Sequence, residues 1–303
     1  MTVKPPESGP EFEAMMRAID ADLSKEDVSI PHRPIRAVIA VGTMFKLAMP
    51  FFKPSLGAPA ELKATAQLSE NIHAWYEAAY GDRLKLDMGM GKMVIELDRD
   101  LYILAFPRIM GSVQFVTLTK FIDAPRFSSN GPAICNILQL VQDLTEAKAG
   151  TLSIEALRGL DQKFNTGLEA HDILESSQKQ ELIRIARGDI LTAINTLMDR
   201  HDRFAESKWA SLQAAEKTLK AAIVLQGGMY KNTHDLAKLC EHLESLGLRF
   251  NWFPLTSVIQ CSPAIRYGDE PCSREEALAA HQASLKLVVA LKDAGTKFEQ
   301  SLL

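Results

Sequence analysis

The chain has 303 residues, of which 47% are hydrophobic and 24% are charged, and its formal net charge is −4. These values are ordinary for a globular protein with room for two domains, and the small negative charge excludes an overall field that attracts nucleic acid or an anionic membrane. The apolar runs are too short to span a bilayer, and the four cysteines form no CxxC pair, so we expect a cytoplasmic protein with reduced thiols and with neither a metal site nor a cofactor.

The first part of the chain is predicted to be a leader followed by an α+β domain. Residues 1–34 combine a Pro- and Glu-containing tail with one short helical pattern, as in a terminal segment that docks a single helix. Between residues 92 and 121, three apolar runs separated by turns predict a small antiparallel sheet, a meander of about three strands. The domain is expected to cover residues 35–180. Its helices are predicted over 59–80, 134–148 and 152–179.

Methionines are frequent in the same region. They either line an adaptable apolar pocket or fill the core, because the unbranched thioether side chain fits irregular gaps. The six are Met44, Met49, Met88, Met90, Met93 and Met110.

The last part of the chain, residues 181–303, is predicted to be all helix. Ser273 and Glu276 have the S-x-x-E form of a capping box directly before an apolar-periodic segment, which marks a helix start. The fold class is therefore α+β, with a small antiparallel sheet and helices in the N-terminal part and a bundle of four to five helices in the C-terminal part. The five helices are expected over 182–200, 203–226, 233–247, 254–262 and 274–300.

Glu216 stands on the apolar stripe of the 203–226 helix, within about 40° of the buried positions at 100° per residue. A buried carboxylate must find a partner or give up its charge, because burying an unpaired ion costs several kcal/mol. Lys220, four residues on, is the nearest candidate partner, and Arg266 is another. Glu216 is then either half of a structural ion pair or a carboxylate poised at a site.

Thr233 and His234 lie at a predicted helix start. Asn232 or Thr233 could cap the free amides there while His234 packs. Alternatively, the positive end of the helix receives a phosphate and His234 hydrogen-bonds the same anion.

Arg266 and Tyr267 follow Pro263 in a loop. The guanidinium of Arg266 either fastens this loop to backbone carbonyls or presents its planar fork to a phosphate.

These segments together resemble the HEPN family of helical bundles. The resemblance covers residues 185–303 and rests on Gln213–Lys217, Thr233–Leu236, Arg266–Tyr267 and the closing helix with Glu275–Ala277. It implies an up-down bundle of four to five helices that commonly dimerises and acts as a nucleotide-binding or partner-docking module. A homodimer, a nucleotide or RNA partner, and no membrane are expected. The region before the bundle resembles no family.

The resemblance also raises an enzymatic alternative. HEPN ribonucleases carry an arginine and a histidine separated by four to six residues, and Arg274 and His281 have this spacing, with Glu275 where that motif prefers a short polar residue. By resemblance, His281 is then the base and Arg274 stabilises the phosphorane of a metal-independent endoribonuclease. The other interpretation is a solvated arginine and an interface or core histidine. Three functions remain open: a non-catalytic ligand-binding module, a ribonuclease, and a structural interaction protein.

Overall fold

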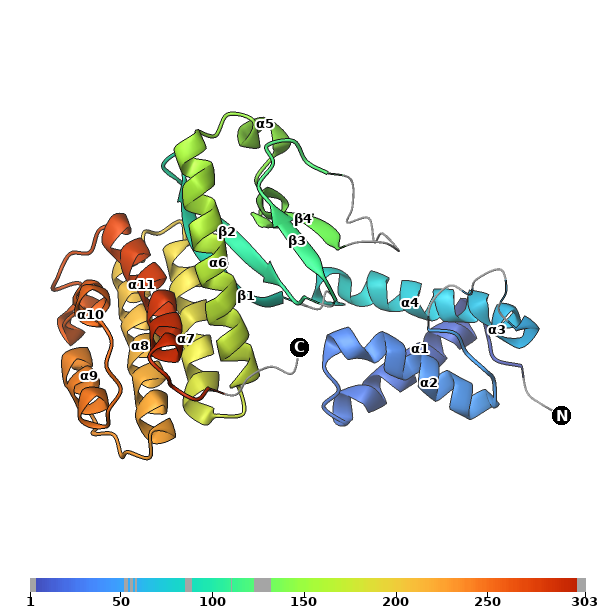
Figure 1. Cartoon of the computed structure of the whole chain (residues 1–303). Coiled ribbons are helices and arrows are strands. Elements are labelled where there is room, and N and C mark those ends of the chain that lie inside the picture. Colours follow the sequence, from blue (N-terminus) through green and yellow to red (C-terminus); the bar gives the residue numbers. More distant parts are fainter. Residues whose placement is uncertain are drawn as a thin grey trace. The chain divides into compact units, whose positions relative to one another are not determined.

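The computed structural model describes residues 4–51, 54, 57, 59–84, 89–109, 111–122 and 132–298. Contacts group the chain into two compact units, Met1–Asp87 and Met88–Leu303 (Figure 1). The boundaries expected after residues 34 and 180 both fall inside a unit. The three-part division of the sequence therefore stays a prediction.

Unit 1 is helical in its described part. Its core consists of one apolar stripe from each long helix, with Met16, Val38 and Ile72 among the fully buried residues. A polar contact at its edge joins Tyr80, which donates to Asp20, and Arg33, which pairs with the same carboxylate at 3.2 Å. The helices are α1 (Gly9–Lys25), η1 (Ile30–His32), α2 (Arg33–Phe45), α3 (Ala60–Ala64), α4 (Ala66–Tyr80) and η2 (Gly81–Leu84).

Unit 2 begins with the antiparallel hairpin of β1 (Gly89–Leu97) and β2 (Asp100–Pro107). The two turn residues, Asp98 and Arg99, both have positive φ, 50° and 72°. Left-handed conformations at both central positions are those of a type I′ turn, whose twist matches that of the flanking strands. The predicted small antiparallel sheet is confirmed, with two strands.

The third predicted strand behaves differently. β3 (Val113–Val116) does not extend the hairpin into a meander but pairs in parallel with β4 (Ala133–Asn136). The helix predicted over 134–148 is also wrong, because β4, η3 (Ile137–Leu140) and the single-turn α5 (Glu146–Ala149) occupy it. Its apolar residues Ile137, Leu138 and Val141 join the core from a short irregular segment.

The rest of unit 2 is all helix, as predicted, and the α+β fold class is confirmed. In Figure 1, α8 stands between α7 and the pair α9–α10, α11 packs against both α8 and α6, and the hairpin lies against α6. No helix in the described part of the chain is long and apolar enough to cross a membrane. The elements are α6 (Ile154–Ser176), α7 (Glu181–Leu197), α8 (Phe204–Leu225), α9 (Leu236–Ser245), α10 (Phe253–Ile259), η4 (Pro263–Tyr267) and α11 (Arg274–Asp293).

Two glycines allow the hairpin to approach α6 closely. A Cβ at Gly167 would lie 2.2 Å from the ring of Phe106, and a Cβ at Gly91 would lie 2.0 Å from Nδ1 of His171. Because interiors are close-packed, neither contact leaves room for a methyl group. The hairpin and the helices therefore share one continuous core.

Candidate functional site

The buried carboxylate of Glu216 lies at the centre of a polar cluster on α8. Its side chain is 6% exposed and that of Lys220 is 7% exposed, and Lys220 donates to Oε1 at 2.6 Å. Gln213 donates to Oε2 at 3.2 Å, and Nδ1 of His234 lies 2.6 Å from the same oxygen. We call these four residues the Glu216 cluster. The pairing with Lys220 that the i, i+4 spacing predicts is confirmed.

The carboxylate also fixes the orientation of His234. An ionised carboxylate only accepts hydrogen bonds, so Nδ1 must carry the proton, which leaves Nε2 as the other functional nitrogen of the ring. The side chain of His234 is 58% exposed. It therefore presents an oriented imidazole to solvent beside a buried carboxylate, and its ring centroid lies 5.7 Å from that of Trp209.

The start of α9 differs from the expectation. The N-cap is Asp235, which accepts from the amide of Lys238 at 3.2 Å, while Thr233 accepts from the amide of Asp235 at 3.1 Å. Gln260 accepts from the amide of Leu236 at 3.0 Å. Because protein groups already occupy these amides, the helix end is closed by its own side chains and is poorly suited to receive a phosphate.

Arg266 extends the cluster with an aromatic surface. Its guanidinium carbon lies 5.2 Å from the ring centroid of Trp209 and 5.8 Å from that of Tyr267. The ring of Trp209 in turn lies 5.7 Å from that of His234. Among the described residues, Arg266 makes neither an ion pair nor a hydrogen bond, so the latch to backbone carbonyls is not found in this part of the chain. The structure thus brings Glu216, Lys220 and His234 together, and Trp209 connects Arg266 to the ring of His234. Thr233 and Tyr267 are the sequence neighbours of His234 and Arg266.

The other predicted pair lies elsewhere. Arg274 is the first residue of α11 and faces Glu96 at 3.7 Å and Glu275 at 3.4 Å. The capping box of Ser273 and Glu276, which starts this helix, is confirmed.

His281, two turns on, is fully buried. Its Nε2 accepts from the backbone amide of Val94 at 3.1 Å, and burial lowers its pKa to about 3. Nε2 is thus committed to β1 and the ring is held neutral, which does not suit a general base that must reach an RNA phosphate.

His281 is one of several helix side chains along the free edge of β1. Arg187 donates to the carbonyl of Met90, Nε2 of His171 donates to that of Lys92, and Gln282 donates to that of Val94. An unprotected strand edge offers unpaired backbone groups to other chains. Side chains from α6, α7 and α11 bond to backbone groups on this edge of β1, which we call the capped edge of β1. His281 is a buried member of this edge.

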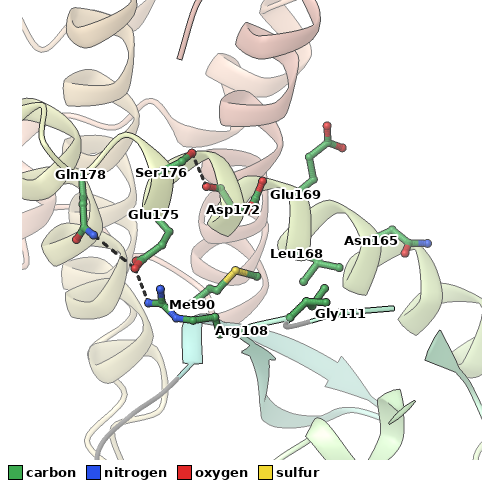
Figure 2. Close-up of a pocket in the computed structure, with 11 residues that line it drawn as sticks. Met90, Arg108, Gly111, Asn165, Leu168, Glu169, Asp172, Glu175, Ser176 and Gln178 are labelled. Atoms are coloured by element: carbon green, nitrogen blue, oxygen red, sulfur yellow. Dashed lines mark hydrogen bonds and ion pairs between the residues drawn. The ribbon is translucent and has the colours of Figure 1, made fainter. Parts of the chain in front are cut away.

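A pocket lies beside α6, next to Met90 of β1 and Arg108 after β2, and the sequence did not predict it. It has a volume of about 630 Å³, and Figure 2 shows Glu169, Asp172 and Glu175 along the helix, with Glu175 bonded to Arg108. The i, i+3, i+6 spacing of these acids on a predicted helix was the available signal. Of the methionines expected at a pocket, Met90 lines this one and Met49 lines a smaller one in unit 1. Met93 is buried in the core, whereas Met88 and Met110 lie outside the described residues.

Cysteines provide no further site in the described residues. Cys240 is buried, and burial raises the pKa of its thiol to about 12, so the thiol stays protonated and unreactive. Within the described ranges, no group of three or more His, Cys, Asp or Glu side chains is arranged to hold a metal ion.

The architecture from α7 to α11 is that of an all-helical bundle with one buried, fully paired carboxylate. Residues 179–284 match the family model of the HEPN domain. The C-terminal part of the chain is a HEPN domain, as the sequence resemblance implies, and the N-terminal region matches no family model. No curated protein and no solved structure matches the chain.

Proposed function

We propose that the HEPN domain is a non-catalytic module that binds a nucleotide, or another phosphate-bearing ligand, on the surface above the Glu216 cluster. The observation that carries this proposal is the position of Arg266. Its guanidinium has no hydrogen-bonding partner in the described part of the chain, and it lies over the ring of Trp209, whose centroid is 5.7 Å from that of the oriented ring of His234. A planar cationic fork next to aromatic faces suits a phosphate joined to a stacking base.

The neighbouring charges support this arrangement. Glu216 offsets Lys220 below the surface and holds His234 by Nδ1. Lys217 is paired with Asp189 at 2.7 Å. The buried cations are therefore satisfied by carboxylates, while Arg266 and Nε2 of His234 remain for a ligand. Protonated Nε2 would donate to a phosphate oxygen.

The test is calorimetric titration and thermal unfolding with AMP, ADP and ATP, with adenosine as the ligand that lacks phosphate. A ligand at a hundredfold excess over its Kd raises the free energy of unfolding by about 2.7 kcal/mol. We expect the phosphorylated ligands to bind and adenosine to bind more weakly. Arg266→Gln should weaken binding by about tenfold or more, because hydrogen bonds between charged groups contribute about 1.5–3 kcal/mol.

The matched control is Arg249→Gln. Arg249 is an exposed arginine of the same domain, and its replacement removes the same charge. Equal nucleotide affinity in Arg266→Gln and Arg249→Gln would contradict the proposed surface. If no nucleotide binds the wild type, the structural interaction protein becomes the better explanation.

The ribonuclease alternative has its own test. Wild type and Arg274→Gln are incubated with mixed RNA, since Arg274 is partly exposed and its replacement should leave the fold intact. We expect no cleavage, or equal cleavage, by the two proteins. Cleavage by the wild type alone would favour the nuclease.

We also propose that the bundle forms a homodimer, as the family resemblance implies. Light scattering after size-exclusion chromatography should then give a mass twice the 33.5 kDa of one chain. A mass of one chain at all concentrations would reject the dimer.

A further inference from the structure

The pocket on α6 has the size and the walls of a small-molecule site. Its volume of about 630 Å³ lies within the range of about 300–1,000 Å³ in which ligand pockets fall. Met90, Ile109 and Leu168 contribute apolar side chains to its lining, and Asn165 and Gln178 contribute amides. A ligand there could bury an apolar body and still find polar partners.

Two of the three carboxylates in the pocket have cationic partners. Glu175 pairs with Arg108 at 2.6 Å and with Arg187 at 2.5 Å. Glu169 pairs with Lys292 at 2.5 Å. The protein thus neutralises the acid on either side of Asp172.

Asp172 is the exception. Its side chain is half-buried, and in the described ranges it makes no ion pair and no side-chain hydrogen bond. The pKa of Lys292 is raised first by its hydrogen bond to Glu169 and to a smaller extent by the charge of Asp172, so that ammonium is already bonded to Glu169. An ionised carboxylate that is partly removed from water and lacks a counter-charge favours a cation brought by a ligand.

We propose that this pocket binds a small organic cation, a primary amine or a guanidinium carried on an apolar body. The cationic group binds Asp172, the carboxylate of the lining that has no cationic partner among the described residues. The apolar body lies against Leu168 and Met90. An anionic ligand would instead meet the unpaired carboxylate of Asp172, because Arg108, the cationic side chain among the described lining residues, is already bonded to Glu175 (Figure 2).

Three probes of similar size separate charge from shape. Phenethylamine is the cation, phenethyl alcohol is its neutral counterpart and hydrocinnamate is an anion on the same ring. In isothermal titration calorimetry of the full chain, phenethylamine should bind at least about tenfold more tightly than the other two. Agmatine, which carries a primary amine and a guanidinium on one aliphatic chain, tests whether an organic cation without the ring also binds.

The decisive variant is Asp172→Asn, which keeps the shape and removes the charge. It should weaken phenethylamine binding by about tenfold or more and leave the melting temperature close to that of the wild type. The control is Glu155→Gln, the same change of charge in the first turn of α6, about 25 Å along the helix axis from Asp172. Its affinity for phenethylamine should equal that of the wild type.

Other outcomes overturn the proposal. One is failure of phenethylamine and agmatine to bind the wild type. Another is equal binding of phenethyl alcohol or hydrocinnamate, and a third is unchanged binding by Asp172→Asn. Because Arg266 lies outside this pocket, Arg266→Gln should bind phenethylamine normally, so this inference and the nucleotide proposal can fail separately.

Discussion

The Glu216 cluster and the capped edge of β1 each contain a histidine, and the two rings differ in burial and in hydrogen bonding. His234 is more than half exposed, and a buried carboxylate holds its Nδ1. His281 is fully buried, and its Nε2 accepts from the backbone of Val94. The two rings thus differ in their surroundings, one exposed to solvent and one built into the core. The histidine of the arginine–histidine pair that resembles a nuclease motif is His281, the buried one.

The largest expected effect comes from removing the buried carboxylate. Glu216→Gln leaves the charge of Lys220 buried without its partner, and breaking a buried ion pair costs about 3–5 kcal/mol. The free energy of unfolding from urea denaturation measures this loss.

Two further variants complete that test. Glu206→Gln, in an exposed pair with Arg203, should change stability little. The double variant Glu216→Leu/Lys220→Met should recover much of the loss, because both charges are removed together. A small loss in Glu216→Gln would mean that water reaches Lys220.

The capped edge should make stability depend on pH. Burial lowers the pKa of His171 to about 4 and that of His281 to about 3, against about 6.5 in an unfolded chain. Between these values the unfolded chain binds more protons, so stability is complete above about pH 6.5 and falls as the pH decreases. At pH 5 each histidine should cost about 2 kcal/mol.

The measurement compares urea denaturation of three proteins between pH 7 and pH 5. His281→Gln should be less stable at pH 7 but should lose less stability on acidification than the wild type. His201→Gln, which replaces an exposed histidine, should keep the slope of the wild type. Identical slopes in all three proteins would show that His281 is not the group that titrates.

Close packing between the hairpin and α6 gives the next effect. Gly167→Ala places a methyl group on Phe106 and should destabilise by about 1–3 kcal/mol, as overpacked cores do. Gly159→Ala lies on the same helix with nothing within 4 Å of the new Cβ, and it should stabilise by about 0.5–1 kcal/mol. Thermal unfolding of both variants distinguishes contact from helix propensity. Stabilisation by both would place the hairpin farther from α6.

The smallest effect concerns the start of the helix that carries His281. Ser273→Ala removes the side chain that caps α11 and should cost about 1 kcal/mol. Ser8→Ala is the matched control, because Ser8 is the N-cap of α1 but makes no capping hydrogen bond. Chemical denaturation should show a loss for Ser273→Ala only, and equal effects would mean that the cap contributes nothing.

The sequence predicted best what depends on neighbours along the chain. The pairing of Glu216 with Lys220 and the capping box at Ser273 each join residues three or four positions apart. The helices from residue 181 onward were also placed well, because each carries its own apolar period. The capping of α9 was missed since Asp235, Thr233 and Asn232 are all good caps by residue type.

Contacts between segments that are distant in the sequence could not be predicted. The hydrogen bond from Val94 to His281 spans 187 positions, and no local pattern encodes it. The apolar residues after β4 predict a helix, because hydrophobic periodicity alone does not distinguish a short buried irregular segment from a buried helix. Similarly, nothing in the sequence of Gly111–Phe121 distinguishes a parallel partner from an antiparallel one, and the convergence of Arg266 with Trp209 depends on how η4 meets α8.

The capped edge of β1 also bears on the choice of a fragment of this chain, because helices α6, α7 and α11 all bond to that strand. The family match begins at residue 179, after α6 and the hairpin. A fragment trimmed to that boundary would leave His281 facing water where Val94 had been, and would strip α11 of the surface that α6 covers. The region that matches the family model is therefore smaller than the compact unit Met88–Leu303. Recombinant work, including any search for a ligand, should start at the hairpin.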